Sequence, residues 1–321
     1  MALPALLQET LTLPVIASPM FLCSGPDLVI AQCRAGIVGS FPALNARPAS
    51  LLGEWLDRIT AETAGYAPFA VNQIVHRSNK RLDEDMAVIV EHRVPIVITS
   101  LGARPEINDA VHSYGGIVLH DVISNEFAHK AIDKGADGII AVAAGAGGHA
   151  GTQSPFALLQ EIRAWFDGPL VLSGAIAHGR SILAARAAGA DLAYVGSAFL
   201  STVEATAADA YKEMVVASSA KDIVYSNLFT GVHGNYLRGS IEAAGLNPDD
   251  LPVSDPSAMN FGAGGTGDSK AWRDIWGAGQ GIGAVGAIQP AAELIARLRA
   301  EYTAASQALL VPGSAVLGSA G

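Results

Sequence analysis

The chain has 321 residues, half of them hydrophobic and only 16% charged, which is enough apolar sequence to bury one large core. Its formal net charge of −10, with no basic stripe that contains aromatic residues, argues against a nucleic-acid partner. Since it has neither a signal-peptide pattern nor an apolar run of roughly 18 residues, we expect a cytoplasmic protein that does not span or bind a membrane.

Short β-branched runs alternate with longer helical patterns from residue 13 to about residue 200, which is typical of parallel βαβ units. The helical stretches, such as residues 80–93 and 154–166, repeat apolar residues at three- and four-residue spacing. Gly36, Gly135 and Gly189 follow such stretches, where a left-handed residue is expected to end the helix. Eight strands are predicted, at residues 15–21, 37–41, 68–75, 96–101, 116–122, 138–143, 170–176 and 192–199.

Eight strands, each followed by a helix, predict an α/β fold of the (β/α)8 type, the TIM barrel, with its active site on the loops that follow the strands. An open doubly wound sheet is the alternative, but no GxGxxG motif follows the first strand. Residues 202–218 are interpreted as the eighth helix. After it, residues 221–275 are rich in Gly, Asn, Pro and Asp and are predicted to form an insertion that covers the active-site face. The expected organisation is a barrel at 1–220, the insertion at 221–275, and a segment at 276–321 that belongs to the barrel domain.

Two late strand ends carry a glycine followed by a small residue, Gly174-Ala175 after the seventh strand and Gly196-Ser197 after the eighth. Backbone amides at such turns can face an anion, and barrels often bind phosphate at this position. A single pair of this kind is more often a tight turn. Two pairs on adjacent strands favour a phosphate site.

The loop at residues 144–151 is rich in glycine and carries one functional side chain, His149. Glycine lets a backbone approach a flat ligand closely, and a positioned imidazole can act as a general base near neutral pH. An isolated histidine is usually structural, but one among glycines at the catalytic end of a barrel favours a function. His233, in the insertion, is the second candidate.

The remaining histidines are weaker candidates. His76, His120 and His178 could reach the mouth of the barrel, whereas the other three are expected at the surface. No His or Cys pair has metal-site spacing, so no metal is predicted. The two cysteines are interpreted as small buried residues. The three surface histidines are His92, His112 and His129, and the two cysteines are Cys23 and Cys33.

Several segments together resemble the nitronate monooxygenase family, formerly called 2-nitropropane dioxygenases. The resemblance runs from about residue 13 to residue 290 and is strongest in Gly147-Gly148-His149-Ala150-Gly151 and in residues 276–281. It also includes residues 15–20, 172–176 and 195–199. The flavin-containing enoyl-acyl-carrier-protein reductases and NADH:quinone reductases share this pattern, so it indicates the family more firmly than the reaction.

The resemblance implies FMN as the cofactor and His149 as the catalytic histidine, with His233 where an arginine is expected. Ala175 replaces the usual second glycine of the phosphate loop, which requires that only its amide is used and that its φ is negative. Asp121 stands where relatives often have lysine. The implied FMN-binding residues are Gly174, Ala175, Gly196 and Ser197 for the phosphate, the Pro19-Met20 backbone, Asn72 and Gln280 for the ring, and Gly147, Gly148 and Ser173 beside them.

The resemblance also implies a reaction in which a small nitronate or nitroalkane is oxidised with O2 to a carbonyl compound and nitrite. An NAD(P)H-dependent reductase of a quinone or enoyl thioester is the alternative, and a flavin-binding protein without catalysis is a third. The strand-end loops supply Asp121 and no arginine, which predicts weak use of NADH. These patterns leave the oligomeric state open, with a homodimer as one option.

Overall fold

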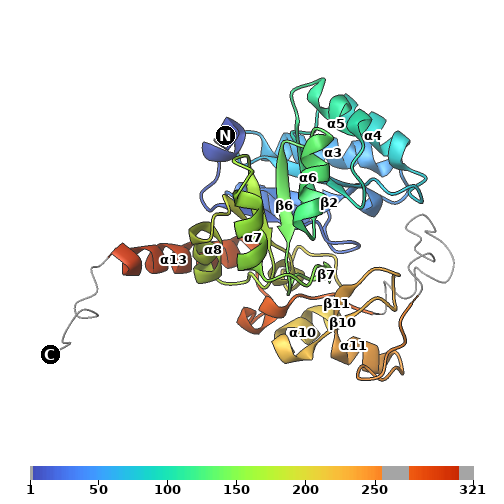
Figure 1. Cartoon of the computed structure of the whole chain (residues 1–321), viewed down its shortest axis with the longest axis vertical. Coiled ribbons are helices and arrows are strands. Elements are labelled where there is room, and N and C mark those ends of the chain that lie inside the picture. Colours follow the sequence, from blue (N-terminus) through green and yellow to red (C-terminus); the bar gives the residue numbers. More distant parts are fainter. Residues whose placement is uncertain (1–2, 255–274, 311–321) are drawn as a thin grey trace.

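The computed structural model describes residues 3–254 and 275–310 of the chain. Residues 255–274 of the predicted insertion and the segment after residue 310 lie outside this description. All eight predicted strands are present, and they form the barrel in Figure 1. Their bounds are β1 (Val15–Ala17), β2 (Gly39–Pro42), β3 (Phe69–Ile74), β4 (Ile96–Ser100), β5 (Ile117–Val122), β6 (Gly138–Val142), β8 (Leu170–Ser173) and β9 (Leu192–Val195).

The strands pair in parallel in the order β1-β9-β8-β6-β5-β4-β3-β2. The two outer strands then meet, because the Ala17 amide donates to the Val38 carbonyl at 2.8 Å and the Val38 amide donates to the Val15 carbonyl at 3.1 Å. This contact closes the sheet. The predicted (β/α)8 barrel is therefore confirmed.

The seventh and eighth strands are shorter than predicted. β8 ends at Ser173 because Gly174 turns the chain with φ +142°. β9 ends at Val195, since Ser197–Leu200 form the short helix α9. In both places an apolar run continues beyond the strand into a turn, so the composition alone overestimated the strand.

The outer helices follow the strands as expected. Proline at the first turn begins α2, α5 and α7, where its missing amide costs no hydrogen bond. Gly36, Gly135 and Gly189 have φ of +90°, +93° and +108°, which confirms them as left-handed residues at helix ends. The helices are α1 (Ala5–Gln8), α2 (Pro26–Arg34), α3 (Leu51–Thr63), α4 (Leu82–Glu91), α5 (Pro105–His112), α6 (Asn125–Asp133), α7 (Pro155–Arg163), α8 (Gly179–Ala187), α10 (Asp209–Ala217) and α13 (Ala291–Leu310).

The place between α8 and α2 on the outside of the barrel is filled by α13, which packs against both helices. Figure 1 shows α13 beside α8. A helix is present within the predicted range 202–218, as α10, but it packs against α9 and η4 (Gln280–Ala284) on the active-site side. The chain thus crosses the barrel mouth before it completes the helical ring.

Two apolar layers hold the barrel together, as expected when successive strand residues point to opposite faces. The inner layer fills the barrel and contains Ile16, Ile98, Leu119, Ile140 and Val171. The outer layer lies between the strands and the helices. Each apolar side chain that folding removes from water contributes about 1.5–3 kcal/mol.

The described part of the insertion forms a small antiparallel sheet on the active-site face, in the order β10-β11-β7. Its strands are β10 (Ile223–Ser226), β11 (Gly234–Leu237) and β7 (Gly148–His149), and β7 belongs to the glycine-rich loop after β6. Helix α11 (Arg238–Ala243) follows β11. Among the described residues, no helix has both the length and the apolar character to cross a membrane.

Candidate active site

A cavity of about 1130 Å³ opens at the carboxyl ends of the barrel strands. Its wall contains residues from the turns after all eight strands, together with residues 225, 231–233 and 275–277. Small-molecule sites usually measure about 300–1,000 Å³. The cavity is therefore large enough for a cofactor with a substrate beside it.

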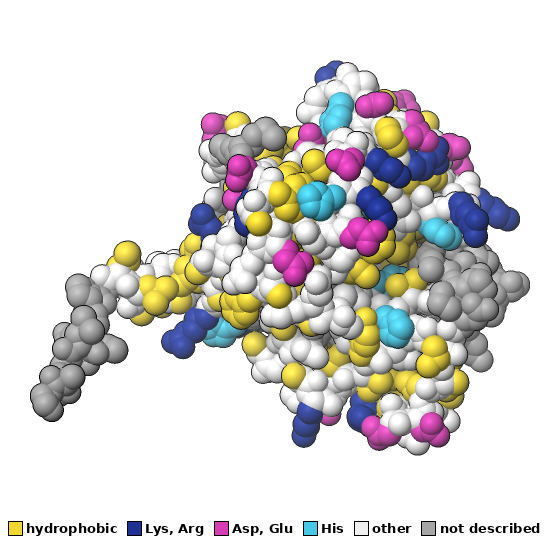
Figure 2. Space-filling model, viewed as in Figure 1, with side chains coloured by type: hydrophobic (Ala, Val, Ile, Leu, Met, Phe, Trp, Pro, Cys, Tyr) yellow, Lys and Arg dark blue, Asp and Glu magenta, His cyan; other side chains and the backbone are white. Residues whose placement is uncertain are grey.

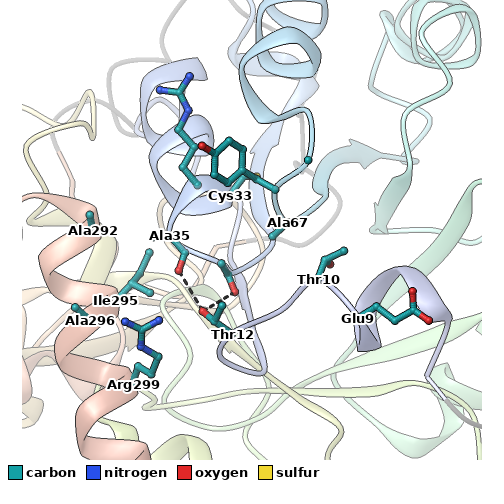
Figure 3. Close-up of a pocket in the computed structure, with 14 residues that line it drawn as sticks. Glu9, Thr10, Thr12, Cys33, Ala35, Ala67, Ala292, Ile295, Ala296 and Arg299 are labelled. Carbon is teal, nitrogen blue, oxygen red and sulfur yellow. Dashed lines mark hydrogen bonds between the residues drawn. The ribbon is translucent and has the colours of Figure 1, made fainter.

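A second pocket of about 540 Å³ lies at the opposite end of the barrel, since Thr12, Gly36 and Ala67 in its wall each precede a strand. Figure 3 shows Arg299 of α13 on one side of it and Glu9 on another. Thr12 Oγ1 is 3.3 Å from the carbonyl oxygens of Ala35 and Gly36. Because barrel enzymes react at the carboxyl end of their strands, the larger cavity is the candidate active site.

His149 is held in the cavity wall by the insertion. Gly148 and His149 pair with Asn235 and Gly234 of β11. Asn235 Nδ2 also donates to the Ala146 carbonyl at 2.6 Å. The loop that carries the predicted catalytic histidine is therefore clamped to a segment more than 80 residues away in the sequence.

The imidazole of His149 is oriented by Thr230. The Thr230 hydroxyl donates to the Val232 carbonyl at 3.0 Å, and His149 Nε2 lies 3.0 Å from the same hydroxyl oxygen. A carbonyl can only accept, so when the Thr230 proton goes to Val232 the ring proton of His149 is on Nε2, and Nδ1 is the basic atom. Burial lowers the pKa of His149 to about 4. The ring is thus neutral at physiological pH and able to accept a proton.

His233 lies beside this sheet in a different orientation. It lines the cavity and stacks on Tyr225, with ring centroids 5.0 Å apart. The Ala150 amide donates to the His233 carbonyl at 3.2 Å, so the pairing extends one residue beyond β11. Successive strand residues point to opposite faces, and this register therefore directs His149 and His233 to opposite faces of the sheet.

The glycines of the loop permit a close chain crossing. A Cβ on Gly147 would lie 2.8 Å from the Gly279 nitrogen and from Ser197 Oγ. A Cβ on Gly279 would lie 2.5 Å from the Gly145 carbonyl oxygen. The sequence interpretation assigned the glycines to a ligand. In the structure Gly147 and Gly148 do line the cavity, but the closest approach at Gly147 is to the protein's own 276–281 segment.

The turns after β8 and β9 present open amides to the cavity. Within the described parts of the chain, no group accepts a hydrogen bond from the amides of Gly174, Gly196 or Ser197. Gly174 also needs its special conformation, since a Cβ there would lie 2.8 Å from the Ala144 carbonyl oxygen. Ser173 lines the wall beside them. This arrangement suits an anionic group such as a phosphate.

Ala175 differs from expectation in two respects. Its φ is +55°, so the prediction of a negative φ is wrong. Its amide donates to the Gly145 carbonyl at 3.2 Å and is not available to a phosphate. The turns after β8 and β9 therefore offer three backbone amides to an anion, and not the four that were predicted.

The predicted ring-binding residues are only partly brought together. Pro19, Met20 and Asn72 line the cavity, whereas Gln280 is exposed and lies outside its wall. The Met20 amide donates to Ser24 Oγ and its carbonyl accepts from Asn45 Nδ2, so its backbone is already used. Asn72 Nδ2 donates to the Ile98 carbonyl and to Ser100 Oγ, which leaves Oδ1 to accept from a ligand.

The charged residues around the cavity also differ from those found on the strand-end loops of the sequence. Arg47, Lys130 and Lys134 line the wall, whereas the strand-end loops counted in the sequence supplied Asp121 and no arginine. Arg47 follows β2, and the lysines reach the cavity from α6; neither segment was among the loops counted. Figure 2 shows basic and acidic side chains interspersed on the face that it presents.

The other histidines divide as expected, with two exceptions, His178 and His92. His76 and His120 line the cavity, but His178 caps α8 and contacts Glu301 at 3.3 Å. His112 and His129 are exposed, and His92 is half-buried. The described residues hold no cluster of His, Cys, Asp or Glu that could bind a metal, and both cysteines are buried.

Two side chains that contact candidate site residues were not singled out by the sequence analysis. Thr230 occupies the same motif as His233, Thr-Gly-Val-His-Gly-Asn, yet nothing local shows that it reaches His149. Ser100 ends β4 and donates to Asp121 Oδ2. Ser100 lies at a barrel strand end, where a polar side chain was an available signal, whereas Thr230 lies in the loop between β10 and β11.

The chain is similar to several known proteins. The family profile described as nitronate monooxygenase matches residues 57–301. A nitronate monooxygenase of Paraburkholderia phytofirmans is 27% identical, covering 90% of this chain and 92% of that one. A putative monooxygenase of Mycobacterium tuberculosis and a (3aS,4S,5R,7aS)-5-hydroxy-7a-methyl-1-oxo-octahydro-1H-indene-4-carboxyl-CoA dehydrogenase of Rhodococcus jostii are also 27% identical, over 71% and 72% of this chain, but the matches span only 64% and 68% of their lengths.

Solved structures show the same relationship. The nitroalkane oxidase from Streptomyces ansochromogenes has a TM-score of 0.79 and 25% identity, covering 94% of this chain and 99% of that one. FabK from Thermotoga maritima, at 24% identity, shares the fold with a TM-score of 0.77 over 95% of this chain and 96% of its own. Because the family profile matches most of the sequence, the chain belongs to the nitronate monooxygenase family of flavin oxidoreductases.

Proposed function

We propose that this enzyme uses FMN and O2 to oxidise small alkyl nitronates, or the parent nitroalkanes, to a carbonyl compound and nitrite. The observation that carries the proposal is the neutral imidazole of His149, held in the cavity wall by Thr230. Such a ring can take the proton from the carbon next to the nitro group of a neutral nitroalkane. His233, which is exposed and lines the same cavity, is proposed to contact the substrate at the outer edge of the site.

The free backbone amides in the cavity wall are suited to the phosphate group of FMN. Gly174, Gly196 and Ser197 would hold the phosphate, as nothing else described uses their N–H groups. Asn72 Oδ1 would accept from the ring, and Pro19 and Met20 would pack beside it. FMN would supply the redox chemistry, passing electrons from the nitronate to oxygen. The protein's part is to bind, orient and deprotonate the substrate.

The test is the colour and reactivity of the purified protein. We expect a yellow protein that releases FMN on denaturation and whose flavin is bleached by propionate 3-nitronate without oxygen. Admitting air should restore the colour and yield nitrite. A colourless protein that also fails to bind added FMN would contradict the proposed cofactor, and a flavin inert to nitronates would contradict the reaction.

A second candidate is an NAD(P)H-dependent reductase of a quinone or an enoyl thioester. It is favoured by Arg47, Lys130 and Lys134, because cations in the cavity wall can bind the phosphates of a second large ligand. Lys130 is partly neutralised by Glu126 at 2.5 Å. Rapid saturable bleaching by NADH, with no response to nitronates, would assign the enzyme to this reaction.

The pH dependence should reflect the lowered pKa of His149. A protonated imidazole cannot accept a proton, so activity on a neutral nitroalkane should fall only as the pH drops through about 4, well below the ordinary 6.5. The measurement is kcat/KM for freshly dissolved nitroethane against pH. A decline that begins near pH 6.5 and vanishes in His149→Asn would contradict the lowered pKa of His149.

Thr230 should act by positioning His149. Thr230→Val keeps the side-chain shape but removes the hydroxyl that contacts Nε2, and we expect about tenfold slower oxidation of a neutral nitroalkane with FMN retained. Thr230→Ser, which keeps the hydroxyl, is the matched control and should recover most of the rate. Equal loss in both variants would assign the effect to packing.

A further inference from the structure

Asp121 places an acidic group in the wall of the active-site cavity. It is the next-to-last residue of β5, two residues after Leu119, which points into the barrel, so the two side chains share the inward face. Of the described residues that line the cavity, no other is Asp or Glu. The open amides at the β8 and β9 turns belong to the same cavity.

Ser100, the hydrogen-bond partner of Asp121, lies across the barrel mouth from the amides of the β9 turn, and Asp121 lies on the next strand, β5. In the closed order of the eight strands, β3, β4 and β5 are opposite β8, β9 and β1. A ligand whose phosphate lies on Gly196 and Ser197 therefore extends toward Asn72, Ser100 and Asp121.

A hydrogen-bond chain fixes this carboxyl. Asn72 Nδ2 donates to Ser100 Oγ at 2.7 Å, and Ser100 Oγ donates to Asp121 Oδ2 at 2.5 Å. The serine hydroxyl has a single proton, so this bond uses it. The carboxyl is thus held at a defined place in the wall.

The surroundings make the charge of Asp121 responsive to pH. Burial raises the pKa of Asp121 to about 6, even though the Ser100 hydrogen bond favours the ionised form and lowers it. The negative charge in turn helps to raise the pKa of Tyr194. No cation contributes to the Asp121 pKa, and none forms an ion pair with it among the described residues.

We propose that Asp121 is the residue that selects ligand charge in this site, admitting small oxyanions when its carboxyl is protonated and repelling them when it is ionised. The inference deepens the proposed function and rests on it only for the identity of the natural anion, a nitronate. A neutral nitroalkane would not feel this repulsion. The ionisation state of Asp121 would therefore decide which form of the substrate the site binds, the anionic nitronate or the neutral nitroalkane.

Other titratable groups in the wall can be separated from Asp121. Burial lowers the pKa of His149 and of His120 to about 4, so both stay neutral above about pH 5. The pKa of Tyr194 is raised well above 10, so it does not ionise in this range. The remaining titratable or charged groups are unchanged in an Asp121 variant, so any pH effect of theirs persists there. These are Cys23, His76, Tyr211, Tyr225, His233, Arg47, Lys130 and Lys134.

Nitrate is a suitable probe because it is a planar oxyanion like the nitronate head and is inert toward flavin in the absence of a reductant. Its affinity is measured by calorimetry on the purified protein with its bound flavin, at about pH 5 and about pH 8. We expect wild type to bind nitrate at least about tenfold more weakly at the higher pH, as repulsion by an ionised carboxylate requires. Asp121→Asn should bind it with nearly equal affinity at both. Glu54→Gln, an exposed change of the same chemistry outside the cavity, should behave as wild type.

Ser100→Ala gives an independent test that leaves Asp121 in place. Loss of the hydrogen bond that lowers the Asp121 pKa should move the transition in nitrate affinity to a higher pH. An unmoved or lowered transition would overturn the proposal. So would equal affinity of wild type at both pH values, the full pH effect in Asp121→Asn, or no nitrate binding to any variant at about pH 5. Because no turnover is involved, these outcomes are separate from failure of nitronate oxidation.

Discussion

Replacing His149 with Asn is expected to leave FMN bound and to slow the oxidation of a neutral nitroalkane by about 10²-fold or more, as loss of a general base does. Asn retains polarity but cannot take the proton. The effect on a preformed nitronate should be much smaller, because its proton has already been removed. The measurement compares kcat/KM for nitroethane and for ethyl nitronate in the variant and in wild type.

His233 provides a control for this result. His149 and His233 face opposite sides of the small sheet, so His233→Asn combined with His149→Asn should multiply the two single effects. Strong non-additivity would mean that the histidines act as a unit. Equal loss of activity on both substrates in His149→Asn would show that this residue binds the anion and is not the base.

Replacing Gly196 with Asp is expected to weaken FMN binding by about 10²-fold, since like charges placed together cost several kcal/mol and about 1.4 kcal/mol is a factor of ten. The position tolerates a side chain in other respects. Its φ is −112°, and a Cβ would lie 3.1 Å from Ser18 Cβ, a contact that a small shift can relieve. The measurement is the FMN dissociation constant, with circular dichroism as the check on folding.

Gly196→Asn is the matched variant, because it has the same size without the charge. We expect its loss of affinity to stay below about tenfold, since only steric crowding remains. Equal losses in the two variants would assign the effect to shape, and full FMN occupancy in Gly196→Asp would place the phosphate elsewhere. Gly174 is less informative, because at φ +142° any side chain strains the turn itself.

Several features of this protein are encoded locally and were predictable from the sequence. Buried parallel strands need short β-branched runs, and their helices need apolar residues at helical spacing, so eight strands could be counted directly. Glycine at the helix ends follows from the left-handed conformation there, as at Gly135 and Gly189. The position of His149 at the catalytic end of the barrel follows from the same strand count.

Other features depend on contacts between distant segments. The hydrogen bond from His149 to Thr230 joins residues 81 positions apart, so no local pattern could reveal it. Ala175 was expected at negative φ, but its turn must meet the Gly145 carbonyl, and that contact accompanies a left-handed residue. Arg47 reaches the cavity from the β2 turn only because the barrel brings that turn to the common mouth.

By itself, then, the sequence determined the barrel, because periodicity and turn chemistry act over a few residues, and its motifs indicated the family by resemblance. Only the tertiary structure decided that α13 completes the helical ring, that Met20 has no free backbone groups, and that Asp121 faces the same cavity as the open amides. The physical reason is that hydrogen bonding, burial and charge at the site are set by segments that become neighbours only when the sheet closes and the insertion folds over it.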